Sequence, residues 1–62
     1  MNFLEVLRIA IETGQSFRRA EWGSLSSIFV DDYVGYTLRW DVRGAIFANA
    51  KDMLADDWEL VK

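Results

Sequence analysis

The sequence predicts one α+β domain over residues 1–62: an N-terminal helix packed on a small, mainly antiparallel sheet of about five strands, with a short helical turn before the last strand. Three observations support this class. Apolar residues follow helical spacing over residues 3–12, several later segments are short with alternating polarity, and the segments are joined by connections of hairpin length. Short connections favour antiparallel pairing, which leaves one face of the sheet for the helix.

The helix expected over residues 3–12 has recognisable start and stop signals. Asn2 can cap its first turn, and Glu5 stands at the capping-box position. Gly14 is suited to a left-handed C-terminal cap. Ile9 is apolar on the polar side of this helix, and we expect it to face a second subunit. The predicted core stripe, with Leu4 at its edge, consists of Phe3, Val6, Leu7, Ala10 and Ile11.

The strands are predicted from β-forming residues bounded by Gly, Ser and Asp. In the first strand, alternation should place Phe17 and Arg19 on one face and Arg18 and Trp22 on the other. The expected loop and turns lie at residues 23–27, 31–35 and 42–44. The expected strands span residues 16–21, 28–30, 36–41, 45–47 and 58–61.

The C-terminal stretch runs from one helical turn into the last strand. Asn49 is a good N-cap for that turn, and Asp52 follows three residues later, where a carboxylate faces the positive end of the helix. Trp58 and Leu60 then alternate with Glu59, as in a half-buried strand. We expect Trp58 to anchor the core.

The composition argues against catalysis and against a metal or cofactor. The chain has no Cys and no His, so disulfides, thiolate metal sites and a histidine base are excluded. We interpret the acidic pairs, Asp31-Asp32 and Asp56-Asp57, as structural carboxylates, because no calcium-loop spacing is present. Three loop serines have no adjacent base to activate them: Ser24, Ser26 and Ser27. We therefore expect a protein that is not an enzyme.

Charge and length bear on the partners. A net charge of −3 disfavours general DNA or RNA binding, and no apolar run approaches the ~20 residues that span a membrane. The first residues lack the basic region of a signal peptide, which predicts a cytoplasmic protein. A domain this small buries only ~60% of its unfolded surface, and without disulfides or metals a homo-oligomer is the remaining means of support.

Arginines and tryptophans occur side by side. Arg18 and Arg19 stand near Trp22, and Arg39 precedes Trp40. Guanidinium groups bind phosphate and indole rings stack on bases, so this grouping suits a small nucleotide. The alternative is that both tryptophans belong to the core or to a subunit interface, with the arginines solvating strand faces.

Two segments also resemble a known family, the phage-encoded Thoeris anti-defence family of cyclic-nucleotide sponges. The N-terminal segment is Asn2-Phe3, an amphipathic helix, Gly14 and Phe17-x-Arg19-x-x-Trp22; the C-terminal segment is Asp52-Met53-Leu54-Ala55-x-Asp57-Trp58-Glu59. Together they cover about half of the chain. Three departures from the family pattern are a shorter middle region, Ala45-Ile46 in place of Pro-Trp, and Glu21 where a small residue is usual.

The resemblance implies an α+β homo-oligomer, a dimer or tetramer, that captures cyclic ADP-ribose isomers or cyclic oligonucleotides in a bacterial cell without catalysis. Its ligand pockets would be shared between subunits. Trp22 would stack on a base, Arg19 and Arg18 would contact phosphate, and Asn49 with Asp52 would offer polar contacts. The alternative function is a small protein–protein interaction module or a structural homo-oligomer.

Overall fold

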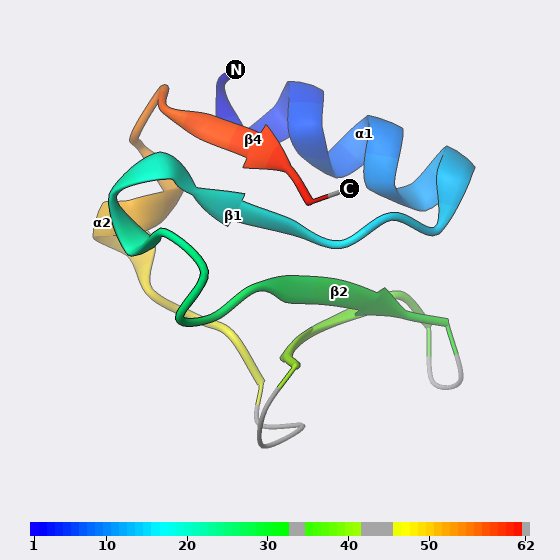
Figure 1. Cartoon of the computed structure of the whole chain (residues 1–62). Coiled ribbons are helices and arrows are strands. Elements are labelled where there is room, and N and C mark those ends of the chain that lie inside the picture. Colours follow the sequence, from blue (N-terminus) through cyan, green and yellow to red (C-terminus); the bar gives the residue numbers. More distant parts are fainter. Residues whose placement is uncertain (33–34, 42–45, 62) are drawn as a thin grey trace.

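An antiparallel sheet with one long helix across one face forms the body of the protein (Figure 1). The structure is a computed structural model that describes residues 1–32, 35–41 and 46–61. The strand order in the four-stranded sheet is β3-β2-β1-β4. The elements in chain order are α1 (Phe3–Thr13), β1 (Phe17–Arg19), the 3-10 turn η1 (Ala20–Trp22), β2 (Ile28–Asp31), β3 (Thr37–Trp40), α2 (Ala50–Met53) and β4 (Trp58–Leu60). The predicted α+β class is confirmed.

Both ends of α1 are formed by the residues that the sequence indicates. The Asn2 side chain accepts a hydrogen bond from the Glu5 backbone N–H at 2.9 Å, and the Glu5 side chain accepts one from the Asn2 N–H at 3.4 Å. Gly14 ends the helix with a φ of 74° and donates its N–H to the Ala10 carbonyl at 2.8 Å. Since glycine lacks a Cβ, it adopts this left-handed geometry without steric cost.

The buried face of α1 is narrower than predicted. Val6 and Ala10 are fully buried, and Phe3 and Leu7 are partly buried and pack against the core. Ile11, which we expected in this stripe, is exposed. At 3.6 residues per turn Ile11 lies about 140° around the helix from Val6, beyond the sector that the sheet covers.

β1 ends earlier than predicted, because the chain turns at Ala20. The Ala20 N–H donates to the Asp57 carbonyl at 3.0 Å, and the Gly23 N–H closes the 3-10 turn on Ala20 at 3.2 Å. This turn brings the Trp22 ring to the core side, 5.3 Å from the Trp58 ring. The predicted alternation, which placed Trp22 on the face opposite Phe17, is therefore wrong.

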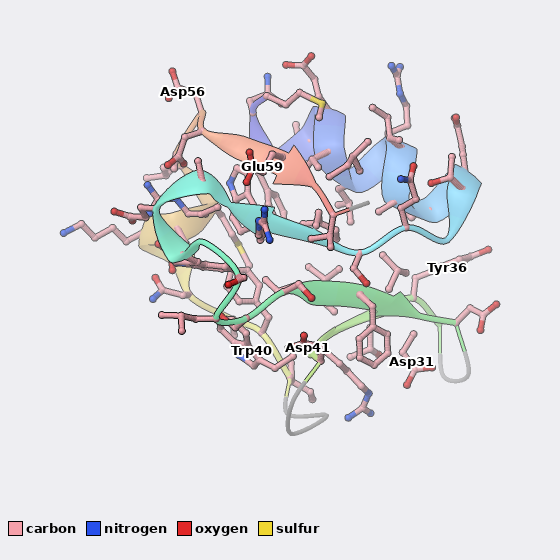
Figure 2. All side chains as sticks on the ribbon, viewed as in Figure 1. Asp31, Tyr36, Trp40, Asp41, Asp56 and Glu59 are labelled. Carbon is pink, nitrogen blue, oxygen red and sulfur yellow. The ribbon has the colours of Figure 1, made fainter. Side chains whose placement is uncertain are left out.

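β3 also differs at its start. Leu38 and Trp40 pack together on the core side, as their alternation predicts. Tyr36, expected in the same strand, has a φ of 59°, precedes β3 and is exposed at the end of the sheet (Figure 2). The turns predicted at 31–35 and 42–44 fall partly or wholly outside the described residues.

The strand expected at 45–47 is reduced to a short extended contact in the described part of the chain. Ile46 forms an isolated bridge with Arg39, and the Phe47 N–H donates to the Leu38 carbonyl at 2.9 Å. Residue 45 lies outside the described residues. This contact covers part of the outer edge of β3 and leaves the sheet with four strands instead of about five.

Trp58 lies at the centre of the core, as predicted. Among the described residues, four rings surround it, with centroids 5.3 to 6.0 Å from its own: Phe3, Phe17, Trp22 and Phe47. Its indole Nε1 donates to the Asp52 carbonyl at 3.0 Å, so the polar atom of this buried side chain is satisfied. Trp58 thus joins α1, β1, η1 and the segment before α2 in the core.

The sheet face turned away from α1 carries paired polar side chains. Arg18 Nε lies 2.9 Å from Glu59 Oε1, and Arg39 Nε lies 2.9 Å from Asp31 Oδ2. The buried Ser27 hydroxyl donates to Asp41 at 3.0 Å. These pairs cross neighbouring strands, as is usual for the solvated face of an antiparallel sheet.

The accessible surface and the radius of gyration of the single chain are close to those of ordinary folded monomers. Its accessible surface is 4326 Å², and the scaling for folded monomers gives roughly 4100 Å² at this mass. Its radius of gyration is 10.5 Å, against about 10.6 Å expected for this length. Compactness alone therefore does not require a second subunit.

We predict that Trp58→Phe destabilises the fold strongly. The smaller ring leaves a void among the aromatic neighbours, and the Asp52 carbonyl loses one of its hydrogen-bond donors, for a combined cost of about 2–4 kcal/mol. Chemical denaturation followed by circular dichroism measures this change. Leu25→Ala, at a leucine that is 85% exposed, should change the unfolding free energy by less than about 0.5 kcal/mol; equal effects of the two substitutions would contradict the central role of Trp58.

Candidate functional site

Arg19 is the centre of an ion-pair cluster at the end of β1. Its Nε donates to Asp57 Oδ1 at 2.7 Å, and its Nη2 donates to Asp57 Oδ2 at 3.2 Å. Its Nη1 donates to Asp52 Oδ1 at 2.7 Å and lies 2.6 Å from Glu21 Oε1. One guanidinium thus holds carboxylates from η1, from α2 and from the residue before β4. We call these four residues, Arg19, Glu21, Asp52 and Asp57, the Arg19 cluster.

Strand register and a helix cap bring the Arg19 cluster together. The pairing of β1 with β4 sets Arg19 opposite Trp58 and therefore beside Asp57. On α2, the Asn49 side chain accepts hydrogen bonds from the N–H groups of Lys51 at 3.1 Å and Asp52 at 3.3 Å, which confirms the predicted cap. That cap fixes the turn from which Asp52 reaches Arg19.

The cluster carries one positive and three negative charges. Hydrogen bonds from Arg19 hold the pKa of Asp57 below its ordinary value, and the carboxylates of Asp57 and Asp52 raise the pKa of Arg19. Glu21 is the outermost member, since 59% of its side chain is exposed against 17% for Asp52. The net charge of the cluster is therefore negative, and it stays negative with Asp52 and Asp57 alone, so the site attracts cations more than anions.

Three indole rings lie next to this cluster. The Trp22 ring lies 5.1 Å from the Trp40 ring at 42° and 5.3 Å from the Trp58 ring at 83°. Trp22 and Trp40 are only partly buried, whereas Trp58 is sealed inside. Trp22 and Trp40 therefore pack on the core, as the alternative interpretation of the sequence expected, and part of their surface stays accessible.

The structure gathers some of the candidate residues and separates others. Arg19 and Asp52 bind each other, and Trp22 follows Arg19 at the same end of the sheet. Arg18 lies on the opposite face, where it pairs with Glu59 on β4 (Figure 2). Asn49 is exposed, and its side-chain oxygen is used in the cap of α2.

Two members of the Arg19 cluster were not among the residues singled out from the sequence for ligand binding, namely Glu21 and Asp57. Local patterns do not reveal that Asp57 meets Arg19, because the two residues are separated by 38 positions. The available signal is indirect: an arginine in the first strand and an acidic residue just before the last strand suit each other only if those strands pair.

Among the described residues, one member of each acidic pair forms a salt bridge with an arginine. Asp57 holds Arg19, and Asp31 holds Arg39, which agrees with their interpretation as structural carboxylates. Among residues 1–32, 35–41 and 46–61, no group of three or more acidic side chains is arranged to hold a metal ion. Within the same ranges, no helix has the length and apolar character needed to cross a membrane.

Comparison with known proteins yields no relative: no family model, no curated protein and no solved structure matches this chain.

We predict that the Arg19–Asp57 pair makes stability depend on pH. The pKa of Asp57 is lower in the folded state, so its stabilising effect is present at neutral pH and is lost as the pH falls through the folded-state pKa. Urea denaturation at pH 7 and at acid pH should show a smaller loss for Asp57→Asn than for the wild type. The control is Asp56→Asn, at the exposed neighbouring position (Figure 2), which should keep the wild-type pH dependence.

Proposed function

We propose that this protein is a phage or prophage anti-defence protein that binds a cyclic nucleotide immune signal and sequesters it without catalysis. The ligand is a cyclic ADP-ribose isomer or a cyclic oligonucleotide. The protein works in the bacterial cytoplasm as a homo-oligomer, a dimer or a tetramer. The proposal combines the sequence resemblance with the place in the fold where its two segments meet.

The observation that carries the proposal is the meeting of those segments in the Arg19 cluster. Arg19 and Trp22 come from the N-terminal segment, and Asp52, Asp57 and Trp58 come from the C-terminal one. Arg19 binds both aspartates, and Trp22 packs on Trp58. The two halves of the resemblance are therefore parts of one structural unit, as expected if they were retained together.

The geometry supports a different role for each residue at this site. The Trp22 ring packs against Trp40, Phe47 and Trp58, and the part of it that stays exposed would stack on the base. A phosphate would reach Arg19 by displacing Glu21, whose carboxylate is the most exposed of the three. Asp52 and Asp57 would stay in place and keep the guanidinium oriented. Because Arg18 pairs with Glu59 on the other face of the sheet, it would not contact a phosphate bound to Arg19 of the same copy.

The direct test is calorimetry of the purified protein against a panel of cyclic ADP-ribose isomers and cyclic dinucleotides. We expect saturable heat with at least one of them, and chromatography of the released ligand should show that it is unchanged. Trp22→Phe should keep the fold and weaken binding, because a smaller ring offers less surface to a base. Absence of heat with every ligand at high micromolar protein would refute the proposal.

We further predict that Glu21→Gln tightens ligand binding. The substitution removes a negative charge that competes with phosphate for Arg19, an effect of ~1 kcal/mol or about fivefold in Kd. Glu12→Gln on α1, which removes the same charge at an exposed position outside the Arg19 cluster, is the matched control and should leave Kd nearly unchanged. Equal effects of the two variants would show that net charge, and not the contact with Arg19, is responsible.

A further inference from the structure

A shallow apolar hollow lies where the start of α1 meets the end of α2. It has a volume of about 330 Å³ and is lined by Asn2, Phe3, Leu4, Met53, Leu54 and Ala55. The one polar side chain in this lining, Asn2, already accepts the hydrogen bond that caps α1. Small-molecule sites usually combine apolar walls with a few polar groups that orient the ligand. This hollow lacks such groups, so an apolar side chain of a protein suits it better than a nucleotide.

Two leucines stand at the rim of the hollow with most of their surface in water. Leu54 is 89% exposed and Leu4 is 74% exposed. A single exposed leucine is ordinary, but a cluster of exposed apolar side chains around an apolar hollow marks an interaction surface. The same surface therefore offers both a protruding side chain and a depression to receive one.

We propose that this surface is a two-fold contact between two copies of the chain. In an isologous contact one patch faces itself, so the patch must contain both the inserted side chain and its receptor. Leu54 of each copy enters the hollow of the other, against Phe3, Leu4 and Met53. The α1 side of one copy then lies against the α2 side of the other.

The charges around the hollow fit this arrangement. On α1, Glu5 directly follows Leu4, and Arg8 lies one turn further on. Lys51, on α2, precedes Leu54 by three residues, and Asp56 follows Leu54 in the segment between α2 and β4. Each side therefore carries one acid and one base. Among the described residues, none of these four side chains has a salt-bridge partner within its own chain. The two-fold operation brings Glu5 of one copy toward Lys51 of the other, twice.

The expected contact is small. A standard interface buries about 800 Å² per partner, close to a fifth of the 4326 Å² surface of this chain. The hollow and its rim provide less than that, so the dimer should be weak, with a Kd above about 1 µM. The inference deepens the homo-oligomer part of the proposed function and rests on it; it does not depend on which nucleotide binds.

Sedimentation velocity over protein concentrations from about 10 µM to 1 mM tests the contact. We expect a reversible monomer–dimer equilibrium for the wild type and at least a tenfold weaker dimer, ~1.4 kcal/mol, for Leu54→Asp. Because Leu54 is exposed in the monomer, its circular dichroism spectrum should not change. The matched control is Leu25→Asp, which places the same charge at a leucine that is 85% exposed and distant in sequence from the hollow; it should dimerise like the wild type.

Charge exchange tests the orientation of the two copies. Glu5→Lys and Lys51→Glu should each weaken the dimer about threefold, and the double variant should restore it. Circular dichroism on Glu5→Lys checks that α1 survives the loss of its capping residue. A monomeric wild type at the highest concentration, or a dimer equally insensitive to Leu54→Asp and Leu25→Asp, overturns the inference.

Calorimetry on the same samples separates this inference from the proposed function. A wild type that binds a nucleotide but never dimerises refutes the contact and leaves sequestration standing. A wild type that dimerises through Leu54 and binds no nucleotide refutes sequestration and leaves the contact standing.

Discussion

The pairing of β1 with β4 is the constraint on which the rest of the structure depends. It joins a strand that begins at Phe17 to one that begins at Trp58, and it sets Arg19 opposite Trp58. The core and the Arg19 cluster both follow from this register, since Trp58 faces inward among four aromatic rings while Asp57, one residue earlier, meets the guanidinium. A shift by one residue would turn Trp58 toward solvent and separate both sets of partners.

The Arg19 cluster therefore has two aspects: it holds separate segments of the chain together, and it is the best candidate for a functional site. Partly exposed ion pairs contribute little singly, but a planar guanidinium that holds three carboxylates from separate segments fixes their relative positions. In the function that we propose, the ligand stacks on Trp22 beside this cluster. Glu21 links the two roles in that proposal, because it pairs with Arg19 in the free protein and would give up its place to a phosphate.

Local sequence patterns predicted the elements well where one physical rule dominated. The capping box of Asn2 and Glu5, the left-handed Gly14 and the Asn49 cap were all foreseeable, because each depends on residues within one helical turn. Trp22 was placed on the wrong face, because the alternation rule assumes an extended chain and the 3-10 turn after Arg19 breaks it. In the hydrogen bond at the start of this turn, the Ala20 N–H donates to the carbonyl of Asp57, which is far away in the sequence.

The sequence by itself determined the α+β class, the helix ends, the aromatic anchor at Trp58 and the lack of disulfide or histidine chemistry, because these depend on composition and short-range periodicity. Only the tertiary structure decided which carboxylates hold Arg19, that Arg18 faces away from them, and that Leu4 and Leu54 stand exposed around one hollow. Such contacts join segments dozens of residues apart, and strand register, which no local pattern specifies in so short a chain, selects among the possible partners.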